Sequence, residues 1–85
     1  MSTNNTTTKR SKMTFDEAWD IIATASHNLR TAEKAYAAAH EIAKRNNTPA
    51  NQAELIFAGI ALENRRIDLR YANERTARFH KRIFG

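Results

Sequence analysis

The fold is decided by residues 49–84, which read PANQAELIFAGIALENRRIDLRYANERTARFHKRIF. Aliphatic side chains crowd the first half of this stretch, and arginines crowd the second half. Beyond Pro49 it contains no proline, and Gly59 is its one glycine. Apolar residues recur every three or four positions, which is the spacing of an α-helix. The stretch therefore predicts one long helix from Pro49 to about Phe84.

A second long helix is predicted before it, over about residues 14–46. Thr14 and Glu17 have the spacing of a capping box, in which each side chain bonds to the backbone amide of the other. No glycine or proline follows until Pro49, and alanine is abundant. The preceding residues 1–13 are polar and basic with little to bury, and they predict a disordered basic tail.

Residues 46–49, Asn-Asn-Thr-Pro, separate the two helices. Asparagine tolerates the left-handed conformation that often ends a helix. Thr48 followed by Pro49 is typical of the start of the next helix. Because a connection this short forces neighbouring helices to run antiparallel, the sequence predicts an all-α fold. We expect one domain, residues 14–85, folded as an antiparallel two-helix hairpin that resembles a coiled coil.

The seam between the helices follows a heptad pattern in which large side chains on one helix face alanines on the other. The first helix contributes Phe15, Ala18, Ile22, Ala25, Leu29, Ala32, Tyr36, Ala39 and Ala43. The second helix contributes Leu55, Ala58, Leu62, Arg65, Leu69, Ala72, Thr76, Phe79 and Ile83. Folding at Asn47 pairs Ile22 with Ala72, Ala32 with Leu62 and Phe15 with Phe79. Large facing small is what close helix packing requires, so these residues are interpreted as core.

Arg65 is the exception in this seam. We expect its aliphatic stem to pack in the seam while its guanidinium reaches solvent and pairs with a neighbour such as Glu33. The alternative is that a polar residue at this position fixes the register of the two helices.

The second helix carries more apolar residues than one seam can bury. Together with one residue of the first helix near the turn, these form a predicted apolar partner-binding surface of Ile42, Ile56, Phe57, Ile60, Ile67 and Tyr71. We prefer a homodimer that forms a four-helix bundle, because two identical hairpins could cover these faces mutually. The alternative is that the surface docks on a different protein.

The chain is basic, with 14 Lys and Arg against nine Asp and Glu and a net charge of +5. Arg75, Arg78 and Arg82 are spaced to share one face of a continuous helix. The predicted partner-binding or nucleic-acid-binding cations are Lys9, Arg10, Lys12, Arg66, Arg70, Arg75, Arg78, Lys81 and Arg82. Such cations suit phosphates or an acidic protein surface. The alternative is that they only complement the C-terminal end of the helix, where positive charge is favourable.

Sequence motifs for chemistry are missing. The chain of 85 residues has no cysteine, and neither a nucleophile elbow nor a glycine-rich phosphate loop. His40 and Glu41 match the first part of a zinc-protease pattern, but Lys44 stands where the second histidine belongs. We expect a protein that is not an enzyme, with no catalytic residue, cofactor, metal or small-molecule substrate. With neither a membrane span nor a secretory signal in its pattern, we expect a cytoplasmic, intracellular location.

These patterns predict a small non-enzymatic binding protein. It would regulate, inhibit or scaffold a larger macromolecular partner through protein–protein contact. The alternative is a sequence-independent nucleic-acid-binding accessory protein that uses the cations near the C-terminus. The long helices leave no room for a short recognition helix of the helix-turn-helix type.

Overall fold

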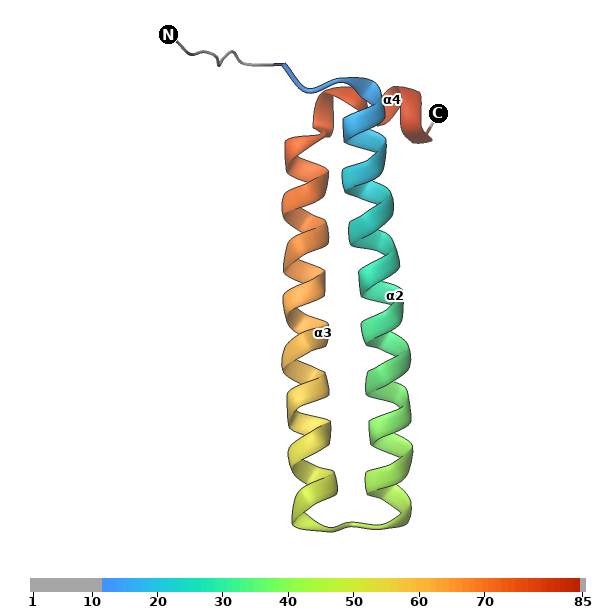
Figure 1. The fold of residues 1–85 in the computed structure, drawn as a ribbon, viewed down its shortest axis with the longest axis vertical. Helices are drawn as coiled ribbons and strands as arrows, with labels where there is room; N and C mark the ends of the chain where they lie inside the picture. The colour runs from blue at the N-terminus through green and yellow to red at the C-terminus, as the bar shows by residue number, and fades with distance from the viewer. Residues whose placement is uncertain (1–11, 85) are drawn as a thin grey trace, which may run out of the picture.

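The computed structural model describes residues 12–84 and consists of two long antiparallel helices followed by a short helical hook (Figure 1). The elements are α2 (Phe15–Arg45), α3 (Pro49–Arg75), the 3-10 helix η1 (Ala77–Phe79) and α4 (His80–Phe84). Within residues 12–84 there is no strand, so the predicted all-α hairpin is confirmed. Lys9 and Arg10 of the predicted tail lie outside the described residues. No helix between residues 12 and 84 has the length and apolar character needed to cross a membrane.

The start of α2 has the predicted capping box. Thr14 is the N-cap, and its hydroxyl accepts a hydrogen bond from the Glu17 amide at 3.1 Å. The Thr14 amide donates to the Glu17 carboxylate at 2.8 Å. Two amides that the first turn would otherwise leave without a partner are therefore satisfied.

The turn between α2 and α3 is held by side chains of α3. Thr48 caps α3 by accepting from the Asn51 amide at 3.1 Å, with Pro49 in the first position as predicted. The Asn51 side chain also donates to the Asn46 carbonyl at 2.7 Å. Asn46, the C-cap of α2, is extended, with φ −141° and ψ 90°. Its carbonyl accepts hydrogen bonds from the Thr48 amide as well as from the Asn51 side chain.

The seam between α2 and α3 is built mainly from alanine. Among the described residues, the buried apolar side chains are Ala18, Ile22, Ala25, Ala32, Ala43, Leu62 and Ala72. The predicted pairing is confirmed at two layers, where Ile22 and Ala72 share one cluster and the Phe15 and Phe79 rings meet edge-on at 6.3 Å. Small side chains let the two helices approach closely, but they bury little apolar surface.

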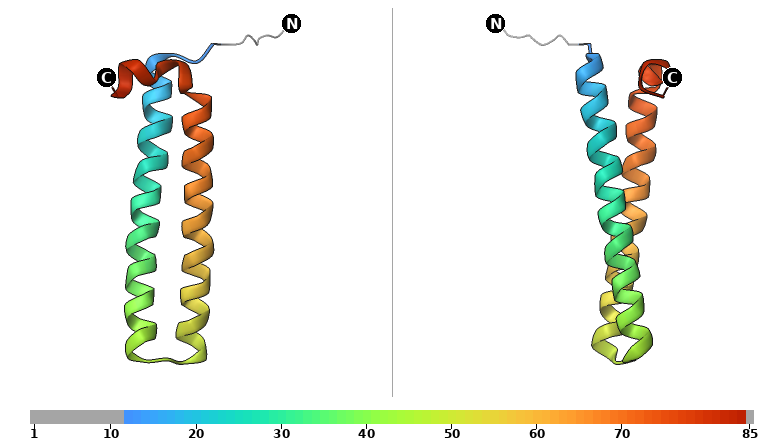
Figure 2. Two further views of the ribbon diagram at one scale, coloured as in Figure 1. Left: turned by 180° about the vertical axis from the view of Figure 1, so that it is seen from behind. Right: turned by 90° about the vertical axis from the view of Figure 1, so that its right-hand side faces the viewer.

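The second helix does not run to Phe84, and this prediction was wrong. It ends at Arg75, and η1 and α4 turn across the first part of α2 (Figures 1 and 2). Phe79 already contacts Phe15, the first residue of α2, so a straight helix would carry Ile83 past the end of α2 into solvent. After the turn, Ile83 packs on the cluster around Ile22, which gives the physical reason for the break.

Thr76 occupies the point where the chain turns. The residue is fully buried, and its hydroxyl donates to the Ala72 carbonyl at 2.7 Å. The same oxygen lies 3.2 Å from Nε2 of His80. A buried hydroxyl without partners would cost free energy, so these bonds make the turn compatible with burial.

Arg65 lies in the seam, but its ion-pair partner differs from the predicted one. Its guanidinium pairs with Asp68, one turn further along α3, at 3.2 Å, and not with Glu33 across the seam. The side chain is 40% exposed, so the head reaches solvent as expected. Its Nε atom is buried without a hydrogen-bond partner. Arg65 pairs with Asp68 and not with Glu33 because an i, i+3 pair on one helix needs no side chain to cross the seam.

Replacing Gly59 by alanine should stabilise the hairpin. Gly59 faces Tyr36, and a Cβ added there would lie 3.4 Å from Cε1 of the ring, an ordinary van der Waals contact. Alanine stabilises a helix interior by roughly 0.5–1 kcal/mol relative to glycine. Gly59→Ala should therefore raise the free energy of unfolding by about this amount in urea denaturation. Gly59→Val is the matched control, because its extra methyl groups would press on the Tyr36 ring. Loss of stability in Gly59→Ala would contradict the packing described here.

Replacing Arg65 by leucine should also stabilise the hairpin. Arg65→Leu removes a buried donor that has no partner and adds apolar surface to the seam, while Asp68 is left exposed to water. The free energy of unfolding should rise by about 1 kcal/mol, the usual cost of an unsatisfied buried group. The control is Arg66→Leu, which removes an exposed cation from an equivalent i, i+3 pair and should stay within about 0.5 kcal/mol. A change of oligomeric state in Arg65→Leu would instead support the role in register.

Candidate functional site

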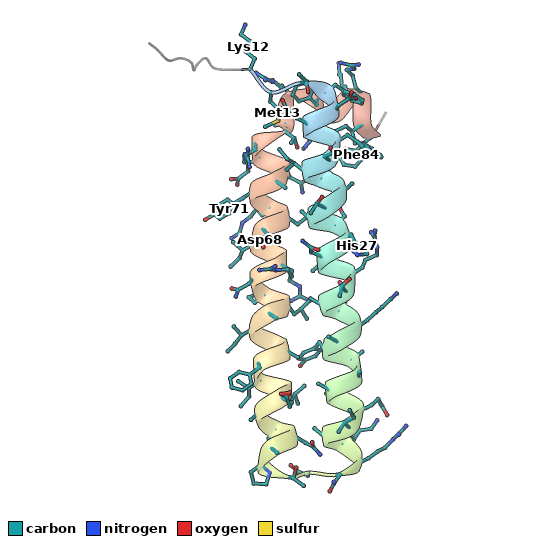
Figure 3. The ribbon with its side chains drawn as sticks, viewed as in Figure 1. Lys12, Met13, His27, Asp68, Tyr71 and Phe84 are labelled. Carbon is teal, nitrogen blue, oxygen red and sulfur yellow. The ribbon has the colours of Figure 1, made fainter. Side chains whose placement is uncertain are left out.

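The side of α3 that faces away from α2 carries four large apolar residues, which we call the α3 outer face: Ile56, Ile60, Ile67 and Tyr71. Each stands two positions from a seam residue such as Leu62 or Leu69. Two positions correspond to about 200° of rotation around an α-helix, which is almost the opposite side. Figure 3 shows Tyr71 projecting from α3 away from α2.

Three of these four side chains are open to solvent in the hairpin. The exposed fractions are 60% for Ile56, 54% for Ile60 and 57% for Tyr71, and Ile67 is half-buried. Asn64 lies on the same face, four positions after Ile60, and is exposed. The seam alone therefore does not account for the apolar residues of α3.

The two other predicted apolar contact residues lie near the turn. Phe57 directly follows Ile56 and is exposed, so it borders the α3 outer face. Ile42 is exposed as well, but it belongs to α2. Because it is one position from the buried Ala43, it borders the seam on the other helix. The structure thus joins Phe57 to the α3 outer face and leaves Ile42 apart from it.

The position of Trp19 in the heptad pattern suggests that it closes the core at the open end of the hairpin against Ile83 or Phe84, and the structure contradicts this because Trp19 and Phe84 are both exposed. Trp19 is half-exposed near the start of α2, and Phe84 is exposed at the end of α4. Phe84 stacks edge-on against His80 at 5.4 Å. The exposure of Phe84 depends on the turn at Thr76, which the heptad pattern did not reveal.

Two of the predicted binding arginines hold the helical hook in place. The Arg78 guanidinium donates to the Met13 carbonyl at 3.1 Å and lies 4.9 Å from the Phe79 ring centroid. The Arg82 guanidinium lies 4.0 Å from the ring centroid of Phe15. Both are cation–π contacts, which are favourable between a guanidinium and an aromatic face. We call this group of contacts the C-terminal clasp.

The prediction that Arg75, Arg78 and Arg82 share one helix face was wrong. The break at Thr76 places Arg75 on α3, while Arg78 belongs to η1 and Arg82 to α4. Arg75 lines a shallow groove between α2 and α3. The three cations therefore do not form a single row.

The remaining predicted cations are on the surface. Lys12, Arg66, Arg70, Arg75 and Lys81 are all exposed. Arg66 pairs with Glu63 at 3.4 Å. Within residues 12–84, Lys12, Arg70, Arg75 and Lys81 have no ion pair. Of the predicted cations, the fold leaves these four most available to an anionic partner.

The groove beside Arg75 has mixed charge. It is lined by Asp20 of α2 and by Asp68 and Arg75 of α3, and Figure 3 shows Asp68 and Tyr71 on the same helix. Tyr71 also contributes to the lining, so it stands at the edge of the α3 outer face and not directly opposite the seam. Asp68 is already paired with Arg65. In the described part of the chain, no three histidine or acidic side chains come together as ligands for a metal ion.

Comparisons with models of protein families, with curated proteins and with solved structures find no match for this chain.

Proposed function

We propose that this chain is a non-enzymatic binding protein that regulates, inhibits or scaffolds a larger macromolecular partner through protein–protein contact. The observation that carries the proposal is the α3 outer face, where large apolar side chains are exposed on the side of α3 opposite the seam. Contiguous exposed apolar patches on small proteins are a usual mark of protein interfaces.

The composition of this face suits a protein partner. Isoleucine and tyrosine side chains fill pockets and lose their contact with water on binding, which stabilises a complex in proportion to the apolar area buried. Glu63 and Glu74 flank the stripe on α3, and Arg70 lies between them in sequence. A centre of apolar residues with a charged rim is the usual arrangement of a protein interface.

Self-association is one way to cover the α3 outer face. Two hairpins paired through these residues would bring four helices together in a single layer, and not around the common core of the four-helix bundle that the sequence predicts. Because the face lies opposite the seam, α3 would be the inner helix of each hairpin and α2 the outer helix. This dimer remains a prediction, and it is compatible with a larger partner bound elsewhere on the hairpin.

A second candidate function is sequence-independent nucleic-acid binding. The net charge of +5 and the unpaired cations Arg70, Arg75 and Lys81 favour it. The C-terminal clasp works against it, because Arg78 and Arg82 already have structural contacts. We therefore rank it below protein binding.

Photo-crosslinking tests the first proposal. A photoreactive amino acid at Ile60 should form protein adducts in the cells that make this chain, because Ile60 lies in the middle of the proposed contact surface. The matched control carries the same group at Lys34, an exposed position of α2. Adducts of position 60 with a different protein that are several-fold enriched over position 34 support the proposal, whereas adducts with a second copy support self-association. Equal labelling at the two positions, or no protein adduct, would overturn it.

A gel shift across a salt series tests the second candidate. The variant Arg70→Gln, Arg75→Gln and Lys81→Gln removes available cations and leaves the C-terminal clasp intact. If phosphates are the target, the slope of log affinity against log salt should fall by about 0.9 for each lost contact on a duplex. The control replaces Lys34, Lys44 and Arg45 by glutamine, which gives the same change of net charge away from the clasp. Equal effects of the two variants, or no shift at low salt, would exclude a binding site at this end.

A further inference from the structure

We propose that the occupant of the α3 outer face is a second copy of this chain, bound antiparallel, with the two-fold axis between Glu63 and Asn64. The inference deepens the proposed function, since it rests on that face being a contact surface. It specifies the partner, the direction of its helix and the register of the contact.

The spacing of the apolar residues on the α3 outer face is palindromic. Ile60 and Ile67 lie equally far from the point between Glu63 and Asn64, and so do Ile56 and Tyr71. In an antiparallel pair of α3 helices, Ile60 is then level with Ile67 of the second copy. Ile56 is level with Tyr71 of the second copy. A two-fold interface requires such a self-complementary surface.

Other registers lose this match. A shift by one helical turn in one direction places Ile56 level with Arg75 of the second copy and Asn64 level with Ile67. A shift in the other direction places Ile60 level with Glu63. Either shift buries a charged or amide side chain against isoleucine, which costs free energy. The palindromic register is therefore the one in which Ile56, Ile60, Ile67 and Tyr71 are all level with apolar residues, with Glu63 and Asn64 at the centre.

The charges of α3 favour the antiparallel direction. A parallel pair would bring Glu74, which lies close to the centre of the face, level with Glu74 of the second copy. It would also place the two basic C-terminal ends side by side. In the antiparallel pair, Arg70 is level with Phe57 and Glu74 with Ala53, and the basic ends lie at opposite poles. Like charges in contact are destabilising, so the antiparallel pair, in which Glu63 is the charge that comes close to its own copy, has the lower electrostatic cost.

The centre of the proposed interface is polar, in a way that suits a two-fold axis. Asn64 lies next to the axis and would face Asn64 of the second copy. An amide side chain both donates and accepts hydrogen bonds, so two such groups can satisfy each other. Glu63 also lies near its own copy, but it is already paired with Arg66 at 3.4 Å. A single polar residue in an apolar helix contact is a known means of fixing register.

Disulfide trapping tests the proposal, and the absence of native cysteine makes single introduced cysteines unambiguous reporters. Asn64→Cys should form a disulfide-linked dimer, because positions 64 of the two copies lie side by side. Lys34→Cys on exposed α2 is the control. At tens of micromolar, Asn64→Cys should crosslink at least roughly tenfold faster, because paired helices raise the effective concentration of the thiols. Circular dichroism of each variant checks that the hairpin is retained.

The variants Ile56→Cys and Tyr71→Cys test whether the two α3 helices run antiparallel. In the antiparallel pair, two copies of position 56 are about 22 Å apart along the helix, since each residue advances 1.5 Å. Neither variant should therefore crosslink with itself faster than Lys34→Cys, whereas a mixture of the two should yield the mixed disulfide. Rapid self-crosslinking of Ile56→Cys would overturn the antiparallel direction.

Light scattering and the photo-crosslinks at position 60 separate this inference from the proposed function. A dimer in light scattering, with self-adducts at position 60, supports the second copy. A monomer at tens of micromolar, with Asn64→Cys no faster than the control, overturns it. If position 60 then labels a different protein, the proposed function stands without the dimer. If it labels no protein, both are overturned.

Discussion

The structure depends on the close approach of two helices through alanine. Five of the seven buried apolar residues within residues 12–84 are alanines. Small side chains bring α2 and α3 together with few voids, but each contributes little buried area. The large apolar side chains of α3 therefore cannot all reach the seam. A thin seam and an apolar outer face are two consequences of the same distribution of residues along α3.

The main features of the hairpin could be predicted because they depend on local pattern. The capping box at Thr14, the helix start at Thr48 and the alanine seam each follow from spacing within one or two turns. The turn at Thr76 could not be found this way, since the heptad continues through Phe79 and Ile83 as if the helix were straight. The chain turns because α2 begins at Phe15 and offers nothing beyond it to bury Ile83. That reason lies in the neighbouring helix and not in the local sequence.

The candidate surfaces show the same division. Exposure of Ile56, Ile60 and Tyr71 follows from their position two residues away from the seam, and the structure agrees. The shared face of Arg75, Arg78 and Arg82 assumed a continuous helix, so it failed with the turn at Thr76. Periodicity also cannot choose between two carboxylates within reach of one guanidinium, as the pairing of Arg65 with Asp68 shows. The sequence therefore predicts which residues share a face of a regular helix, but it does not predict which of several nearby groups a side chain will pair with.

The thin seam also links binding to stability. A chain of this length has a small core, and a partner that binds only the folded hairpin adds its binding free energy to that of folding. The α3 outer face lies on the helix that supplies both the seam and the connection to the C-terminal clasp. Covering that face would therefore stabilise the element on which the other contacts depend. On the proposed function, the apolar residues that the hairpin cannot bury are not a defect of its packing. They make the fully stable form of this protein a bound one, whether the partner is a second copy or a different protein.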